Sequence, residues 1–297
     1  MRLSIALCSI SLAVACGSSA TPTVDAPADV GFEKPTMGAH ANTEGSDGTF
    51  TDAGPADLSC LGTASSDQAT TVAVSLSTIV KDFQNGTPVP GATVTAFQAI
   101  DYASPFATTT ADAEGNLTVT VPVDTTRFGF QMTADMQFPT FLLNQKVDPG
   151  MATQTLAVIQ SVSASTAATL PALIGEVRTP GSGVVAGAVR DCQARTMSNF
   201  VVTVSSTPTT ATRIAGAEAF YFSSNPELPV RHNVAESAGP NGVFMVIQLP
   251  VAASSYVQAW GYKTDADVGG DMVLLSQLQA PFVADTVVTG SFEPVRQ

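Results

Sequence analysis

The side chains that most often carry catalysis are scarce in this sequence. Histidine occurs only twice, as His40 and His232. A Ser-His-Asp triad or a zinc site built from several histidines therefore has almost nothing to draw on. The sequence also lacks a glycine-rich phosphate loop and the G-x-S-x-G and H-E-x-x-H motifs. We expect both histidines to be solvated loop residues, and the chain to be a non-enzyme without cofactor or metal.

Acidic residues dominate the charge. The 297 residues include 25 Asp and Glu against 12 Lys and Arg, a net charge of −13. This balance leaves no basic surface for DNA or RNA, so we expect no nucleic-acid partner. Asp265, Asp267 and Asp271 lie close together in the sequence, but calcium needs six to eight oxygen ligands. They are interpreted as turn residues, with a weak calcium site as the alternative.

The first two cysteines lie at the N-terminus. Leu3 to Ala15 is an apolar stretch that is too short to span a bilayer, which needs about 20 residues. It is typical of a signal peptide, here residues 1–15. Small residues lead directly into Cys16, which resembles the lipobox of bacterial lipoproteins. The resemblance implies acylation of Cys16 and anchoring in a membrane, and Gly17 favours the outer membrane. The alternative is ordinary cleavage after Ala13-Val14-Ala15, which leaves Cys16 as a free thiol.

The other two cysteines are Cys60 and Cys192. Two cysteines in an exported protein favour one disulfide bond. Such a bond would tie the two halves of the chain together, and it requires Cα atoms less than about 7 Å apart. Two buried free thiols are the alternative.

Aromatic side chains gather near the C-terminus, where Tyr256, Trp260 and Tyr262 would share one face of a strand. Such a face could stack on sugars, which predicts a carbohydrate-binding surface as one candidate. A core or a domain interface is the competing interpretation.

The segment before the cysteine at position 60 has a different composition. Residues 16–57 are rich in Ala, Pro, Thr, Gly and Asp, and Lys34 is their only base. Their acids are Asp25, Asp29, Glu33, Glu44, Asp47, Asp52 and Asp57. Low hydrophobicity with high net charge indicates disorder, so we predict a disordered acidic tether.

From residue 58 onward the pattern is that of short β-strands. Apolar residues alternate with polar ones in 72–76, 117–121 and 128–132, and turn residues separate these runs. The most plausible helix lies within 161–174, where Pro171 should confine it to a short turn or two pieces.

The chain also repeats itself. Residues 79–95 match 188–203, and Glu114-Gly115-Asn116 corresponds to Asn241-Gly242. Phe128–Met132 then corresponds to Tyr256–Trp260. We therefore predict two copies of one domain, at 58–160 and 178–297, with a helical connector at 161–177.

The first copy resembles a known family. Val80-Lys-Asp with Pro-Gly-Ala-Thr-Val-Thr95, followed by residues 109–117 and Val121-Pro122, is similar to the carboxypeptidase regulatory-like domain. This resemblance to the transthyretin-like and Cna protein B-type folds implies two tandem Ig-like β-sandwiches, in an all-β chain. The second copy departs from the pattern at Asn199-Phe200-Val201. The family's domains are typically non-catalytic appendages of exported proteins.

Together these features predict an exported, non-catalytic cell-envelope lipoprotein. Its expected partners are the membrane, through the lipid on Cys16, and an envelope protein. A polysaccharide bound on the aromatic face of the second domain is the alternative.

Overall fold

The structure is a computed structural model that describes residues 34–156, 158–210, 212–224, 228–231 and 233–297. Their regular secondary structure is nearly all β, which confirms the predicted fold class. They contain one α-helix, α1 (Ala164–Leu173), and one short 3-10 helix, η1 (Asp265–Asp267). Neither helix is long enough to cross a bilayer.

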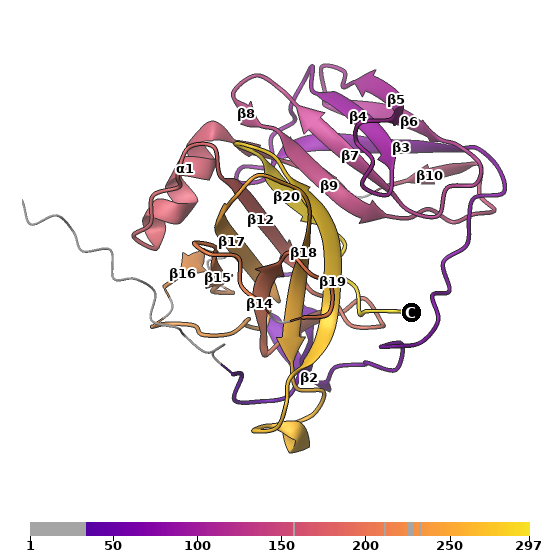
Figure 1. Ribbon diagram of the computed structural model, residues 1–297. Helices are drawn as coiled ribbons and strands as arrows, with labels where there is room; N and C mark the ends of the chain where they lie inside the picture. Colours follow the sequence, from indigo (N-terminus) through magenta and orange to yellow (C-terminus); the bar gives the residue numbers. More distant parts are fainter. Residues whose placement is uncertain (1–33, 157, 211, 225–227, 232) are drawn as a thin grey trace, which may run out of the picture. The chain divides into compact units, whose positions relative to one another are not determined.

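The first copy is a two-layered sandwich (Figure 1). Its strands are β3 (Val74–Asp82), β4 (Thr93–Gln98), β5 (Pro105–Thr110), β6 (Asn116–Val121), β7 (Phe128–Thr133), β8 (Gln137–Phe138), β9 (Thr140–Gln145), β10 (Thr153–Thr155) and β11 (Ile159–Ser163). One layer has β6 on one side of β3, with β10 and β11 on the other side and β8 beyond β11. The other layer has the order β5-β4-β7-β9.

The predicted alternation builds the core of this sandwich. The apolar members of 117–121 and 128–132 are all buried, while Thr118 and Thr120 between them are exposed. Val74 and Leu76 are buried in β3, but Val72 lies before the strand and is exposed. The period of two therefore places the core correctly wherever the strand itself is present.

The second copy repeats the central strands of this plan. Its strands are β12 (Gly183–Ala188), β13 (Thr196–Ser198), β14 (Phe200–Ser205), β15 (Glu218–Phe222), β16 (Pro229–Val230), β17 (Val243–Leu249), β18 (Ala252–Gly261), β19 (Val273–Phe282) and β20 (Val287–Gly290). Strand β12 lies between β17 and β20 as β3 lies between β6 and β11. Strands β14, β18 and β19 correspond to β4, β7 and β9. One difference concerns β15, which pairs with β17, whereas its counterpart β5 pairs with β4.

The two sandwiches are not separate bodies. Strand β20 pairs in parallel with β12 of its own copy and with β9 of the first copy, from Val287 opposite Thr140 to Gly290 opposite Leu143. One layer of each copy thereby joins a single nine-stranded sheet, β16-β15-β17-β12-β20-β9-β7-β4-β5. The larger core also takes in Phe97 and Phe141 of the first copy. Residues 33–297 accordingly form one compact unit.

The described part of the predicted tether is ordered, so the prediction of disorder is wrong for residues 34–57. This segment contains the hairpin β1 (His40–Glu44) and β2 (Phe50–Pro55), and β1 pairs with β13 of the second copy. Ala39 and Ala41 are fully buried. Composition missed this hairpin because backbone hydrogen bonds to β13 and two small buried side chains hold it, without large apolar residues. Residues 16–33 of the predicted tether and the predicted signal peptide lie outside the described residues.

Helix α1 occupies the predicted connector. Ser163 caps it by accepting a hydrogen bond from the backbone N–H of Thr166, and it ends before Gly175, whose φ is +85°. The expectation that Pro171 would break it is wrong, because the helix continues to Leu173. Pro171 lies in the last turn, so its missing N–H costs one hydrogen bond near a helix end.

Candidate functional site

The predicted disulfide between Cys60 and Cys192 is present. The two Cα atoms are 5.8 Å apart, and the bond links residues separated by 132 positions. The backbone N–H of Cys192 also donates to the carbonyl of Asp57 at 2.9 Å. The bond therefore fastens the segment before the first sandwich to the turn that follows β12 in the second.

That turn is built on a buried carboxylate with a counterpart in the first copy. Asp191 accepts hydrogen bonds from the backbone N–H groups of Gln193 and Arg195, and Asp82 accepts them from Gln84 and Asn85. Both carboxylates belong to residues that are at most 5% exposed. They stabilise a turn by accepting from the backbone, so their role is structural.

A cluster of charges that the sequence analysis did not single out holds the C-terminal tail to the first copy. Arg127 donates from Nε to Asp67 at 2.6 Å and from Nη2 to Glu293 at 2.9 Å. Lys146 Nζ lies 3.3 Å from Glu293. Burial alone would raise the pKa of Glu293, but Arg127, Lys146 and the hydroxyl of Ser291 outweigh it and hold this pKa below its usual value.

His40 is not a solvated loop residue, which corrects the prediction for it. It lies in β1, where Nδ1 is 2.9 Å from Asp52 and Nε2 is 3.4 Å from Asp265 of η1. The hydrogen bond to Asp52 raises the pKa of His40 against the opposing effect of burial, and Asp265 raises it further. Asp265 also accepts from the backbone N–H of Gly38 at 2.8 Å. The imidazole therefore joins the hairpin to the second copy. His232 lies outside the described residues.

The three predicted ligand-binding aromatics do not form one exposed platform. Tyr262 is 1% exposed, and its carbonyl accepts a hydrogen bond from Ala39. Tyr256 and Trp260 are half-buried on β18. The indole of Trp260 donates to Gln258 at 3.2 Å, and Gln258 donates in turn to the carbonyl of Thr207. The segment after β14 thus covers the strand between the two half-buried rings.

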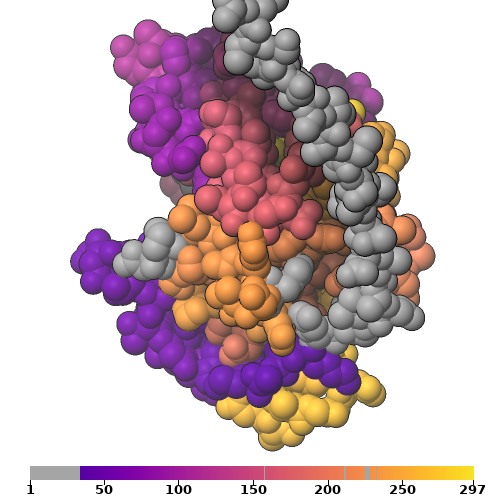
Figure 2. All heavy atoms as spheres, turned by 90° about the vertical axis from the view of Figure 1, so that its left-hand side faces the viewer, coloured from indigo at the N-terminus to yellow at the C-terminus, as the bar shows by residue number. Residues whose placement is uncertain are grey.

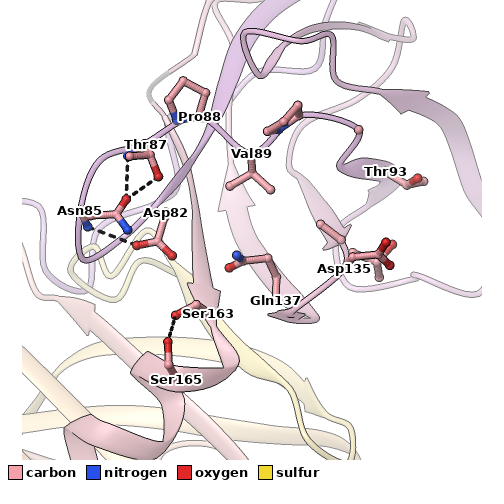
Figure 3. A pocket seen from close by; sticks show the side chains of 14 residues that line it. Asp82, Asn85, Thr87, Pro88, Val89, Thr93, Asp135, Gln137, Ser163 and Ser165 are labelled. Carbon is pink, nitrogen blue, oxygen red and sulfur yellow. Dashed lines mark hydrogen bonds between the residues drawn. The ribbon is translucent and has the colours of Figure 1, made fainter.

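A polar groove of about 810 Å³ lies in the first copy (Figure 3). Its sides come from the turn that carries Asp82, from the segment around Asp135 and from the start of α1 at Ser163. Most of its polar groups serve local structure. Asn85 accepts from the hydroxyl of Thr87, and Ser163 caps the helix. The groove is therefore the space between a turn and a helix cap, and these hydrogen bonds stabilise both.

Within the described ranges, no three His, Cys, Asp or Glu residues are grouped as a metal site would require. Asp267 caps η1 by accepting from the backbone N–H of Thr264 at 3.0 Å, and it also accepts from the hydroxyl of Thr264 at 2.8 Å. Cys16, the predicted lipidation site, lies outside the described residues.

No family model matches the chain, and no curated protein is similar enough to count as a match. Among solved structures, the Bacillus anthracis TIE protein is 9% identical with a TM-score of 0.26, over 74% of this chain and 34% of that one. This chain thus spans about a third of the length of the TIE protein.

Two further solved structures are similar to the same degree. The shaft pilin SpaA from Lactobacillus rhamnosus GG is 11% identical with a TM-score of 0.22, over 77% of this chain and 98% of the pilin. The 3-chlorocatechol 1,2-dioxygenase from Rhodococcus opacus 1CP is 11% identical with a TM-score of 0.25, over 42% and 72% of the two chains. Superpositions this poor carry no argument about function.

Proposed function

We propose that this chain is an exported, non-catalytic module of the bacterial cell envelope that presents binding surfaces on a rigid body anchored through Cys16. The observation that carries the proposal is the nine-stranded sheet shared by both copies. Tandem domains on a linker move relative to each other by default. Here a continuous sheet and a disulfide bond between Cys60 and Cys192 fix the two sandwiches instead.

The charges of the described body support a structural role. Arg127 and Arg195 are paired with carboxylates, as Asp67 and Asp191 show. These pairs hold together the body's turns and terminal segments. The proposed partner is an envelope protein, reached by a body that the lipid keeps at the membrane surface.

Anchoring is tested by the intact mass of the chain extracted from native membranes. We expect a mass increase for a chain that begins at Cys16 and carries acyl groups, and its loss in the variant Cys16→Ser. The variant Cys8→Ser is the matched control, because Cys8 belongs to the predicted signal peptide and should leave the mature mass unchanged. An unmodified mature chain in the membrane fraction would contradict the anchor.

The interaction role is tested by chemical crosslinking in intact cells, followed by mass spectrometry of the purified chain. We expect a discrete envelope protein crosslinked to the wild-type chain and a weaker crosslink to Cys16→Ser, which lacks the anchor. A native chain that crosslinks only to itself or to abundant bystanders in proportion to their amounts would contradict the proposal.

Saccharide binding remains the second candidate, because Tyr256 and Trp260 are half-buried on the same strand. Tyr262 is buried and would take no part. Trp260 is the only tryptophan, so its fluorescence reports on this face alone. A saturable change in emission with one polysaccharide, abolished in Tyr256→Ala, would support the candidate. Unchanged emission across a panel of envelope polysaccharides would exclude it.

A further inference from the structure

An apolar cleft of about 370 Å³ lies between the two copies, under helix α1. Its floor is the face of the nine-stranded sheet formed by β12, β17 and β20, and its walls come from α1 and β11. Figure 2 shows α1, in pink, against the orange residues of the second copy. Ligand pockets in proteins usually measure about 300–1,000 Å³, so this cleft has the size of a small-molecule site.

Small side chains keep the cleft open. At one end of the cleft, Val184 of β12 belongs to a packed cluster with Ile174, which follows α1. Farther along β12 the floor consists of Ala186 and Ala188, and both remain half-buried. Because alanine does not fill the space between helix and sheet, the packing that closes one end of α1 stops there.

The rest of the lining is mostly apolar, with Thr140, Gln160 and Thr289 as its uncharged polar residues. It includes Val162, Leu170, Pro171, Phe222, Val243, Met245 and Val287. Phe83, at one edge of the cleft, is 42% exposed. Displacing water from apolar surface of this kind lowers the free energy of the complex and so favours binding. The lining alone therefore favours a ligand with an apolar body.

The charge of the lining indicates which head group the ligand carries. The chain has 25 acidic residues, yet none of them lines the cleft, and Arg190 is its one ionisable residue. Arg190 is exposed, and its Nη1 donates to the carbonyl of Ala194 at 2.9 Å. Arg190 also lines two other hollows, one with Glu44 and Asp47 and one with Asp191 and Glu293. Among the described residues none of these carboxylates forms an ion pair with it. A guanidinium without a carboxylate partner, beside an apolar cleft, complements an anionic head group.

We propose that this cleft binds a single-chain monocarboxylate, such as a medium-length fatty acid. The apolar chain lies between α1 and the floor at Ala186 and Ala188, and the carboxylate meets Arg190. The site is independent of the lipid anchor and of the aromatic face.

The test is calorimetric titration of the exported full chain carrying Cys16→Ser with dodecanoate. We expect one molecule to bind per chain, with dodecanol, which lacks the charge, binding at least about tenfold more weakly. A hydrogen bond to a charged group is worth about 1.5–3 kcal/mol, which corresponds to about 10- to 150-fold in affinity. The variant Arg190→Gln should therefore lose about that factor for dodecanoate and leave dodecanol binding unchanged. Arg213→Gln is the matched control, because Arg213 is exposed and does not line the cleft.

A second pair of variants tests the cleft itself. Ala188→Leu fills the floor and should abolish binding of both dodecanoate and dodecanol, whereas Ala168→Leu, on the exposed side of α1, should leave both unchanged. Thermal unfolding of each variant checks that it is folded.

The proposal is overturned if dodecanoate does not bind, if Arg190→Gln binds it as the wild type does, or if dodecylamine binds equally well. It is also overturned if the native acylated chain excludes dodecanoate while Cys16→Ser binds it. In that case the cleft holds the protein's own acyl chain instead of a free carboxylate.

Discussion

The two copies share two of their turns and differ most clearly in the partner of one strand. In the first, the backbone N–H of Val80 donates to Gly115, and Val89 donates to Val80. In the second, Val189 donates to Gly242, and Met197 donates to Val189. A turn on a buried aspartate follows each of these strands. The hydrogen bonds that define the domain have therefore persisted where the side chains have not.

The strand that moved is β15. Its counterpart β5 pairs with β4 at the edge of its sheet and ends in exposed or half-buried threonines. Strand β15 instead pairs with β17, and both of its faces are buried. Tyr221 packs in the main core, while Phe220 and Phe222 pack in the cluster that also contains Ile174. A second buried face is thus what keeps β15 in its new sheet.

The move leaves β14 without the neighbour that β5 provides to β4. The backbone N–H of Val202 in β14 donates to the hydroxyl of Tyr221 at 3.0 Å. A side chain of the displaced strand therefore satisfies a backbone donor that would otherwise be buried without a partner. The backbone N–H groups of Ala238 and Ile214 also donate to carbonyls of β14. The difference teaches that irregular backbone and one side chain can together replace a strand pairing.

The largest expected effect comes from the disulfide, which has no equivalent in the first copy, where Phe83 stands in place of Cys192. Chain-entropy arithmetic for a separation of 132 residues gives about 4–5 kcal/mol. We expect Cys60→Ala/Cys192→Ala to lower the free energy of unfolding by about that amount in urea titrations. The wild type with reductant is the control and should lose a similar amount. A loss below about 1 kcal/mol would show that the second copy does not depend on the bond.

The shared turns are tested by the two glycines. Gly115 and Gly242 have φ of +80° and +65°, and a Cβ there would lie 2.7 Å from the carbonyl of Val80 and 2.6 Å from that of Met197. We expect Gly115→Ala and Gly242→Ala each to cost about 2–3 kcal/mol of unfolding free energy. Gly86→Ala is the matched control, because its φ is +67° but nothing lies near its Cβ. Equal costs at all three positions would show that the close approach of the neighbouring carbonyls to Gly115 and Gly242 does not matter for stability.

The strand that moved is tested by Tyr221→Phe. Removing the hydroxyl leaves the buried N–H of Val202 without this acceptor, which we expect to cost about 1–3 kcal/mol of unfolding free energy. Tyr102→Phe is the control in the first copy, where Tyr102 packs its ring against Phe141. If the two variants unfold at the same urea concentration, the hydroxyl does not contribute to replacing the missing strand.

The smallest effects concern the terminal segments. The first copy holds the C-terminal tail and the second copy holds the N-terminal hairpin, and the stability that these two contacts contribute depends on pH in opposite directions. The pKa of Glu293 is lowered from 4.5, so its contribution is present above that pH and lost as the pH falls through the folded value. The pKa of His40 is raised from 6.5, so its contribution is present below that pH and lost as the pH rises through the folded value. We expect about 1 kcal/mol or less from each.

These effects are read as the pH dependence of unfolding in wild type, Glu293→Gln and His40→Gln. Glu114→Gln, at an exposed turn, is the control for the first variant. Amide exchange at Ala39, which donates to Tyr262, reports on the hairpin directly. A Glu293→Gln variant that still loses the same stability at low pH would assign the acid effect to other carboxylates.

The sequence predicted those features that depend on local pattern. Alternation placed the buried residues of β6 and β7, the repeat placed Gly115 opposite Gly242, and the cysteine count indicated one bond. These signals work because period and turn chemistry act within a few residues.

The remaining features depend on contacts between distant parts of the chain. The pairing of β9 with β20, the move of β15 and the docking of β1 on β13 each join segments far apart in sequence. Tyr262 is buried, its carbonyl accepts from the backbone N–H of Ala39, and composition had marked the segment around Ala39 as disordered. Strand partners of this kind leave no local period to find.

The central claim, that the shared sheet makes the two copies one body, is tested most directly in the variant that lacks the Cys60–Cys192 bond. Trp260 fluorescence reports on unfolding of the second copy, and amide exchange at Leu76 and Val119 reports on the first. We predict one urea transition with the same midpoint for both probes. First-copy amides that stay protected after Trp260 is exposed to solvent would show two independent domains and contradict the account.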